Sequence, residues 1–218
     1  MSACALLVYA VCRPPGKRMQ LAGIAGEPLE IVRAADLAAV TGERRRAPRP
    51  TVAAMRRYDA VQRALADQLP AVLPARFGTC MGSVEELAFV LRARDASLRA
   101  ALREVRGRVQ MTLRSADAET ARGAPATDRG SGLAYLRSRA AEAARSREVP
   151  ALAPVLSAVT RWVRAERVVR YGQVASVYHL IPRGSVQAYA NAARRAADAT
   201  GVRMVLTGPF PAYAFGAQ

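Results

Sequence analysis

The chain opens on a run of ten apolar or small residues, from Ala3 to Cys12. Alternate positions of such a run face opposite sides of a strand, so both faces here are apolar. A strand with two apolar faces is typical of the covered centre of a sheet. The pattern therefore predicts a central strand over residues 3–12. Two weaker strands are expected at about 20–24 and 29–33, and residues 41–50, rich in Arg and Pro, are expected to form a loop.

Two longer segments of the first half have helical periodicity. Apolar residues recur every three to four positions over residues 51–69, where Thr51 is a good N-cap and Pro70 stops the helix. Residues 71–80 then favour a strand, and Pro74 places it at a sheet edge or a bulge. A capping box at Ser83 starts a second helical segment that reaches Gly107, as one helix with a break or as a pair.

The second half alternates strands with helices. Polar and apolar residues alternate over 108–113, as in a half-buried strand, and residues 115–130 are expected to form a mobile loop. The remaining pattern predicts helices at 131–148 and 151–164, strands at 166–171 and 173–181, a helix at 184–199 and a strand at 202–207. If the helices at 131–148 and 151–164 count as one unit, the order of elements in the second half is β-α-β-β-α-β.

That order defines the expected fold class. It is the ferredoxin-like arrangement, an antiparallel sheet with helices on one face. We therefore expect an α+β protein of two domains, an N-terminal α+β domain over 1–106 and a modified ferredoxin-like domain over 107–218. The C-terminal tail, residues 208–218, is expected to pack at the domain junction.

Charge raises the alternative of a nucleic-acid-binding protein. The formal net charge is +16, and every basic residue except Lys17 is arginine. The arginines are scattered, and the densest run, at 42–50, is expected to be a solvated loop. RNA-recognition modules share the β-α-β-β-α-β order but stack bases on aromatic residues of the central strands, where this chain offers only Tyr178. A basic nucleic-acid-binding protein with such a domain remains the alternative function.

The sequence contains few of the residues and motifs that are typical of enzyme active sites. His179 is the only histidine, and neither a nucleophile elbow nor a phosphate-binding glycine loop is present. The cysteines Cys4, Cys12 and Cys80 lack metal-ligand spacing and are expected to be buried free thiols. We therefore expect no catalytic residue, no cofactor, no metal and no enzyme activity. The absence of a leader or membrane segment predicts a cytoplasmic protein.

Two short motifs carry more information than the composition. The first is Val-Leu-Pro-Ala-Arg-Phe-Gly-Thr at 72–79, and the second is Leu-Thr-Gly-Pro-Phe-Pro-Ala-Tyr-Ala-Phe at 206–215. The second predicts a strand that leaves its sheet through a Gly-Pro turn and continues as a tail stiffened by proline. The aromatic residues of that tail need a packing surface. They either cover the chain's own surface or help to build a partner-binding surface, and the two interpretations are compatible.

These motifs resemble the GvpF/GvpL family of gas vesicle proteins. The family pattern combines an opening strand, a V-L-P-x-R-F-G-T segment, a Gly-x-x-Tyr-Leu motif (here 132–136) and an L-T-G-P-W-P-P-Y-x-F tail, in this order. The chain departs from the pattern at Phe210 and Ala212, where Trp and Pro are usual, and at Tyr58, where many relatives have His. These departures leave the expected fold intact and weaken the case for a preserved pocket in the first domain.

The resemblance implies a function in gas vesicle assembly. Members are cytoplasmic accessory proteins that bind the hydrophobic shell protein GvpA and other gas vesicle proteins, and some become minor vesicle components. For this chain it implies a partner-binding surface, for which the candidates are Arg76, Phe77, Phe210, Tyr213 and Phe215. The competing interpretation is that Phe77, Phe210 and Phe215 are simply core residues. The motifs do not distinguish an F-like from an L-like member.

Overall fold

The computed structural model describes residues 5–16, 19–115, 149–171 and 174–216. The chain forms two compact units. Unit 1 comprises Met1–Val109 together with Phe210–Gln218, and unit 2 comprises Gln110–Pro209. The predicted loop at 115–130, the predicted helix at 131–148, the Gly-x-x-Tyr-Leu motif and Cys4 lie outside the described residues, except for Ser115 at the start of the loop.

Unit 1 is built on a five-stranded sheet whose centre is the predicted opening strand, β1 (Leu6–Cys12). The strand order is β2-β3-β1-β4, and β5 also pairs with β1. The neighbours are β2 (Leu29–Ala34), β3 (Leu37–Glu43), β4 (Val72–Pro74) and β5 (Cys80–Met81), and all pairings are antiparallel. Six of the seven β1 residues are buried, as expected for a strand covered on both faces.

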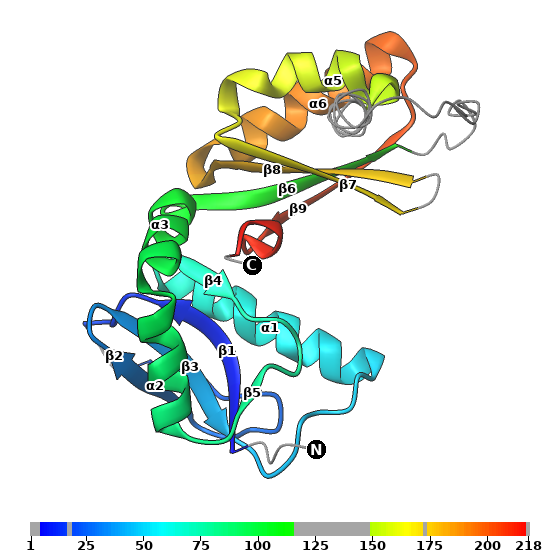
Figure 1. The fold of residues 1–218 in the computed structure, drawn as a ribbon. Helices are drawn as coiled ribbons and strands as arrows, with labels where there is room; N and C mark the ends of the chain where they lie inside the picture. The colour runs from blue at the N-terminus through cyan, green and yellow to red at the C-terminus, as the bar shows by residue number, and fades with distance from the viewer. Residues whose placement is uncertain (1–4, 17–18, 116–148, 172–173, 217–218) are drawn as a thin grey trace, which may run out of the picture. The chain divides into compact units, whose positions relative to one another are not determined.

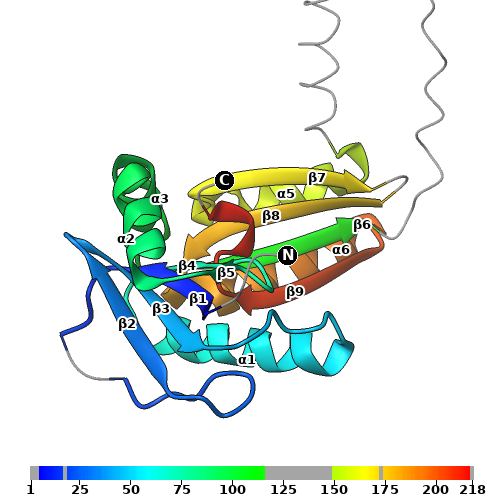
Figure 2. The same cartoon turned by 60° about the horizontal axis from the view of Figure 1, so that its bottom comes forward.

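Helices cover both faces of this sheet (Figures 1 and 2). On one face lies α1 (Val52–Gln68), capped by Thr51 as predicted. On the other face lies α2 (Val84–Ala93), which Ser83 caps through the amide of Glu86. The predicted second helical segment is a pair, because α3 (Asp95–Val105) starts after a break at Arg94. Gly107, at φ 67°, ends it in the left-handed conformation.

The strand β3 was not predicted, and the predicted loop over 41–50 is wrong at its start. Residues 37–42 are all buried, because β3 lies between β1 and β2 in the sheet. Alanines occupy its second and third positions, and alanine has low strand propensity. The strand conformation of residues 37–43 therefore depends on hydrogen bonding to β1 and β2 and not on local strand propensity.

Of the two cysteines in the described residues, Cys80 differs from expectation. Cys12 is a buried free thiol, and burial raises its pKa to about 12, which keeps it protonated and unreactive. Cys80, in β5, is disulfide-bonded. The prediction of free thiols is therefore wrong for Cys80 and confirmed for Cys12.

Unit 2 has the predicted β-α-β-β-α-β order. Its four-stranded sheet has the order β7-β8-β6-β9, in which the first and third strands along the chain are central, as in the ferredoxin-like fold. The strands are β6 (Arg108–Ser115), β7 (Ala165–Tyr171), β8 (Val174–Pro182) and β9 (Met204–Phe210), and β7 and β8 are antiparallel. The helices α5 (Ala153–Val159) and α6 (Val186–Thr200) lie on one face (Figure 1). The predicted α+β fold class is confirmed.

Candidate functional site

The buried face of α1 holds the segment that carries the Arg-Phe-Gly-Thr motif. The hydroxyl of Tyr58 donates to the carbonyl oxygen of Val8 at 2.7 Å and lies 3.1 Å from that of Arg76. Burial raises the pKa of Tyr58, so the hydroxyl keeps its hydrogen. Gln62 donates its amide hydrogens to the carbonyl oxygens of Tyr9 at 2.9 Å and Ala75 at 2.7 Å. Two side chains of one helix thus join β1 to the segment after β4.

This anchoring presents Arg76 and Phe77 side by side. The Phe77 ring packs edge-on against Tyr58, with ring centroids 5.3 Å apart, and Tyr58 stacks on Tyr9 at 5.1 Å. Phe77 is partly buried, whereas the Arg76 side chain is exposed. The carbonyl oxygen of Arg76 accepts hydrogen bonds from the amide and hydroxyl of Thr79. The backbone of the motif is therefore fixed, and the guanidinium group projects into solvent.

The C-terminal tail docks on the exposed side of the same helix. Tyr213 donates its hydroxyl hydrogen to Asp59 Oδ1, and the other carboxylate oxygen of Asp59 accepts from Arg63 Nε at 2.6 Å. The guanidinium carbon of Arg63 lies 4.7 Å from the centroid of the Phe210 ring, a cation–π geometry. Burial and the bond to Asp59 raise the pKa of Tyr213, so its hydroxyl remains a donor.

The end of the tail is anchored by a buried ring. Phe215 is only 2% exposed and belongs to the short 3-10 helix η4 (Tyr213–Phe215), which lies against β4. Ala212 is also buried, at 3% exposure, whereas Tyr213 is 38% exposed. Phe215 therefore holds the tail in place, and Tyr213 presents its ring at the surface.

All five predicted partner-binding residues lie in unit 1, and four of them, Arg76, Phe77, Phe210 and Tyr213, contact a side chain of α1. We call Arg76, Phe77, Phe210 and Tyr213, with their α1 partners Asp59 and Arg63, the tail cluster. Asp59 and Arg63 were not among the predicted site residues, although an acid and a base four residues apart on one helix face are visible in the sequence. Nothing in the spacing could pair Asp59 with Tyr213, 154 residues away.

The chemistry of the tail cluster is that of recognition. It offers two guanidinium groups, one carboxylate and partly exposed rings, but no aligned nucleophile and base. Among the described residues, no group of three or more His, Cys, Asp or Glu side chains could hold a metal ion. No helix within the described ranges is long and apolar enough to cross a membrane.

His179 is a core residue of unit 2. It is 1% exposed; its Nε2 lies 2.8 Å from Glu166 Oε2 and its Nδ1 lies 2.6 Å from the Tyr189 hydroxyl. A carboxylate only accepts, so Nε2 carries the hydrogen, and Nδ1 accepts from Tyr189, whose pKa is raised by burial. The neutral ring is fully hydrogen-bonded. Burial lowers the pKa of His179, although Glu166 opposes that shift.

This arrangement predicts a loss of stability in mild acid. Below pH 6.5, the ordinary pKa of histidine, the unfolded chain takes up a proton that folded His179 resists. The free energy of unfolding should therefore fall as the pH drops, by at most about 1.4 kcal/mol per pH unit from this group. Urea titrations at several pH values, followed by the fluorescence of Trp162, which contacts Tyr189, measure the effect.

The His179→Gln variant is the control for that prediction. Glutamine can still hydrogen-bond but does not titrate, so the His179 component of the pH dependence should disappear. A variant that keeps the full pH dependence of the wild type would contradict the assignment.

Comparison with known proteins places these features in a family. A family model described as gas vesicle synthesis protein GvpL/GvpF matches residues 5–217, almost the whole chain. The chain belongs to the GvpL/GvpF family. Membership supports a role in gas vesicles and confirms the resemblance of the two motifs. No curated protein matches the chain in the corresponding search.

Crystal structures of two GvpF proteins share the fold. The gas vesicle protein GvpF from Anabaena sp. PCC7120 superposes with a TM-score of 0.75 over 99% of this chain and 97% of its own, at 13% identity. GvpF from Microcystis aeruginosa gives a TM-score of 0.73 over 98% of each chain, also at 13% identity. At this identity the likeness establishes the fold alone.

The GvpL/GvpF motif residues have identifiable structural roles here. Gly208, at φ 124°, packs on β6 so closely that a Cβ would lie 2.8 Å from the carbonyl oxygen of Gln110. No other residue fits that position without displacing backbone. Tyr58 supplies the hydroxyl that holds the Arg-Phe-Gly-Thr segment.

Proposed function

We propose that this protein is an accessory factor of gas vesicle assembly that acts by binding the shell protein GvpA and other gas vesicle proteins. The match of a gas vesicle synthesis family over residues 5–217 carries the proposal. Its place of action would be the cytoplasm, with the growing vesicle as its destination.

The tail cluster is the surface we assign to this binding. Tyr213 and Arg76 are exposed, and Phe77 and Phe210 are partly exposed. Aromatic residues and arginine are the side chains that most often dominate the energy of protein interfaces. The hydrogen bond from Tyr213 to Asp59 holds its ring in one orientation, which reduces the entropy lost on binding.

A shell protein with exposed apolar surface needs such a partner before it is incorporated. Free apolar patches aggregate in water, and a protein that covers them transiently prevents this. The rings of the tail cluster provide apolar contact, and the guanidinium groups of Arg76 and Arg63 provide charge at its rim. Phe215 would act indirectly, because its buried ring positions the tail.

Co-purification from cells tests the proposal. Tagged protein, co-expressed with the shell protein GvpA, should retain it at moderate salt. The Tyr213→Ala and Arg76→Ala variants should each reduce the affinity about tenfold, as expected for interface residues of this type. Arg76 is exposed, so its replacement leaves the fold intact even if loss of Tyr213 loosens the tail.

The matched control is Phe89→Ala, because Phe89 is an aromatic residue of unit 1 that is 66% exposed on α2, outside the tail cluster. It should retain the shell protein as the wild type does. Failure of the wild type to retain any gas vesicle protein would refute the proposed function. Equal losses in all three variants would refute the assignment to the tail cluster.

A further inference from the structure

A second surface of unit 1 differs from the tail cluster in chemistry. It comprises the loop after β3 and the first two turns of α1, and its members are Arg45, Arg46, Arg49, Val52, Met55 and Arg56. We call it the basic surface. We propose that the basic surface binds an acidic, amphipathic segment of another protein. The inference rests on the proposed function only in taking the protein to act by binding other proteins.

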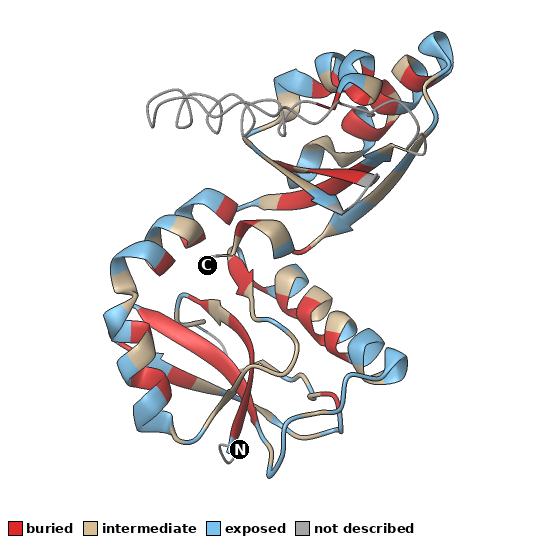
Figure 3. Cartoon of the chain, turned by 45° about the vertical axis from the view of Figure 1, so that its right-hand side comes forward, coloured by how far each residue is buried: buried red, intermediate tan, exposed pale blue. Residues whose placement is uncertain are grey.

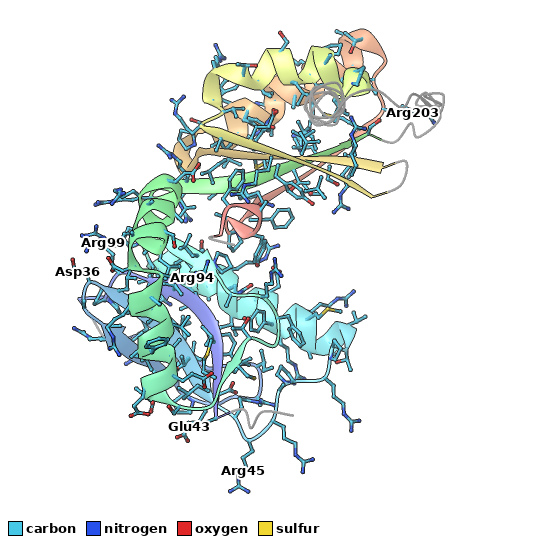
Figure 4. All side chains as sticks on the ribbon, in the orientation of Figure 1. Asp36, Glu43, Arg45, Arg94, Arg99 and Arg203 are labelled. Atoms are coloured by element: carbon cyan, nitrogen blue, oxygen red, sulfur yellow. The ribbon has the colours of Figure 1, made fainter. Side chains whose placement is uncertain are left out.

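Charge is the first observation. Between Glu43 and Arg57 the chain carries six arginines and one carboxylate. Arg44 lies 4.0 Å from Glu27, but the other five arginines form no ion pair with a carboxylate in the described parts of the chain. Arg45 extends away from the body of unit 1 (Figure 4). Like charges held this close repel one another, and a partner that brings carboxylates removes that repulsion.

The start of α1 adds to this imbalance. Its first turn contains no acidic residue, although the positive end of the helix dipole lies there and favours negative charge. Arg49 precedes the cap residue Thr51, and Arg56 follows one turn later. A positive helix end surrounded by guanidinium groups is electrostatically unfavourable in the isolated protein, and an acidic partner would compensate for it.

Exposed apolar side chains lie among these charges. Val52 is 62% exposed and Met55 is 44% exposed. They are three residues apart on α1, and Arg56 is four residues from Val52, so the three share one side of the helix. Figure 3 shows this end of α1 exposed, whereas the later turns carry the buried stripe. A partner must therefore offer apolar groups as well as carboxylates.

These features favour a protein segment over nucleic acid. Phosphate backbones reward positive charge alone, and single-stranded nucleic acid gains further from stacking on aromatic rings. The basic surface has no aromatic residue. Arginine pairs with carboxylates through two parallel hydrogen bonds, and methionine adapts its shape to apolar partners. A helix with glutamates beside a leucine stripe would pair its carboxylates with the arginines and its leucines with Val52 and Met55, and it needs no aromatic residue on the basic surface.

The basic surface adjoins the tail cluster along α1. Val52 is seven residues before Asp59, about 10 Å along the helix, but Met55 and Arg56 are only four and three residues before it. The two surfaces are therefore neighbours that differ in chemistry, and they are tested with different probes.

Peptide titration against the purified full-length protein tests the inference. The probe is a synthetic amphipathic peptide with leucines on one helical face and glutamates elsewhere. A scrambled peptide of the same composition, without an apolar face, is compared with it. We expect the amphipathic peptide to bind at physiological salt and the scrambled peptide to bind at least about tenfold more weakly.

Two double variants locate the binding. Arg49→Ala with Arg56→Ala removes two charges, and Val52→Gln with Met55→Gln removes the apolar contact from exposed positions. Each double variant should lower the affinity for the amphipathic peptide about tenfold. The matched control is Arg194→Ala with Arg195→Ala, which makes the same charge change on exposed residues of α6. It should leave binding unchanged.

Four results would overturn the inference. They are no binding of the amphipathic peptide, equal binding of the scrambled peptide, an equal loss in the α6 control, or displacement of the peptide by a single-stranded RNA that itself binds at physiological salt. None of these measurements involves GvpA. If GvpA is retained but the peptide does not bind, only this inference fails; if the peptide binds and GvpA is not retained, only the proposed function fails.

Discussion

Replacing Tyr58 with alanine is expected to lower the free energy of unfolding by about 3–5 kcal/mol, the usual cost of deleting a buried aromatic ring. The ring is 3% exposed and lies between Tyr9 and Phe77. Its loss leaves a cavity and removes the hydroxyl that binds the carbonyl oxygen of Val8. Urea unfolding followed by circular dichroism measures the change.

The Tyr58→Phe variant separates the two contributions. It keeps the ring and removes only the hydroxyl, so it should cost about 1–3 kcal/mol, the range for leaving a buried acceptor unsatisfied. If the phenylalanine variant were as unstable as the alanine variant, the hydrogen bond would outweigh the packing. An alanine variant as stable as the wild type would contradict both parts of the account.

Phe215→Ala is expected to release the C-terminal tail from unit 1. Phe215 is the largest buried side chain of the tail; Pro211 and Ala212 are also buried but small, and Phe210 and Tyr213 are partly exposed or exposed. Hydrogen exchange at the amides of Tyr213 and Phe215, both bonded within the tail, should accelerate at least about a hundredfold, because local opening no longer costs the burial of the ring. Retention of the shell protein should fall with it.

Tyr213→Phe is the graded control for tail release. It removes the hydrogen bond to Asp59 but keeps the ring and the anchor, so exchange should accelerate by only about tenfold. Unchanged exchange in Phe215→Ala would show that other contacts hold the tail. Equal acceleration in both variants would show that the hydrogen bond, and not the buried ring, is the main attachment.

Periodicity predicted most of the fold because most of its segments follow local rules. The caps at Thr51 and Ser83 and the left-handed Gly107 are local signals, and the structure confirms each of them. The β-α-β-β-α-β order of unit 2 likewise follows from element spacing. The strand β3 shows where this approach fails, because an alanine-rich segment becomes a strand only through its neighbours β1 and β2.

Only the parts of the candidate site that lie in compact sequence motifs could be predicted. The aromatic residues of the tail and the Arg-Phe pair can be recognised in the sequence, because each lies in a compact motif. Their common support, α1, shows only as an ordinary amphipathic helix. The bond between Asp59 and Tyr213 joins residues 154 positions apart, and contacts at such separation leave no periodic signal.

Because Phe210–Gln218 belongs to unit 1, the order of synthesis affects when unit 1 can finish folding. The ribosome makes the strands and helices of unit 1 first, but it makes Phe210–Gln218 only after the whole of unit 2. Until then the nascent chain lacks Tyr213, so Asp59 on α1 has no tail residue to bind. Unit 1 therefore completes its fold only after unit 2 has been synthesised, and a stop codon anywhere in unit 2 leaves unit 1 without its tail.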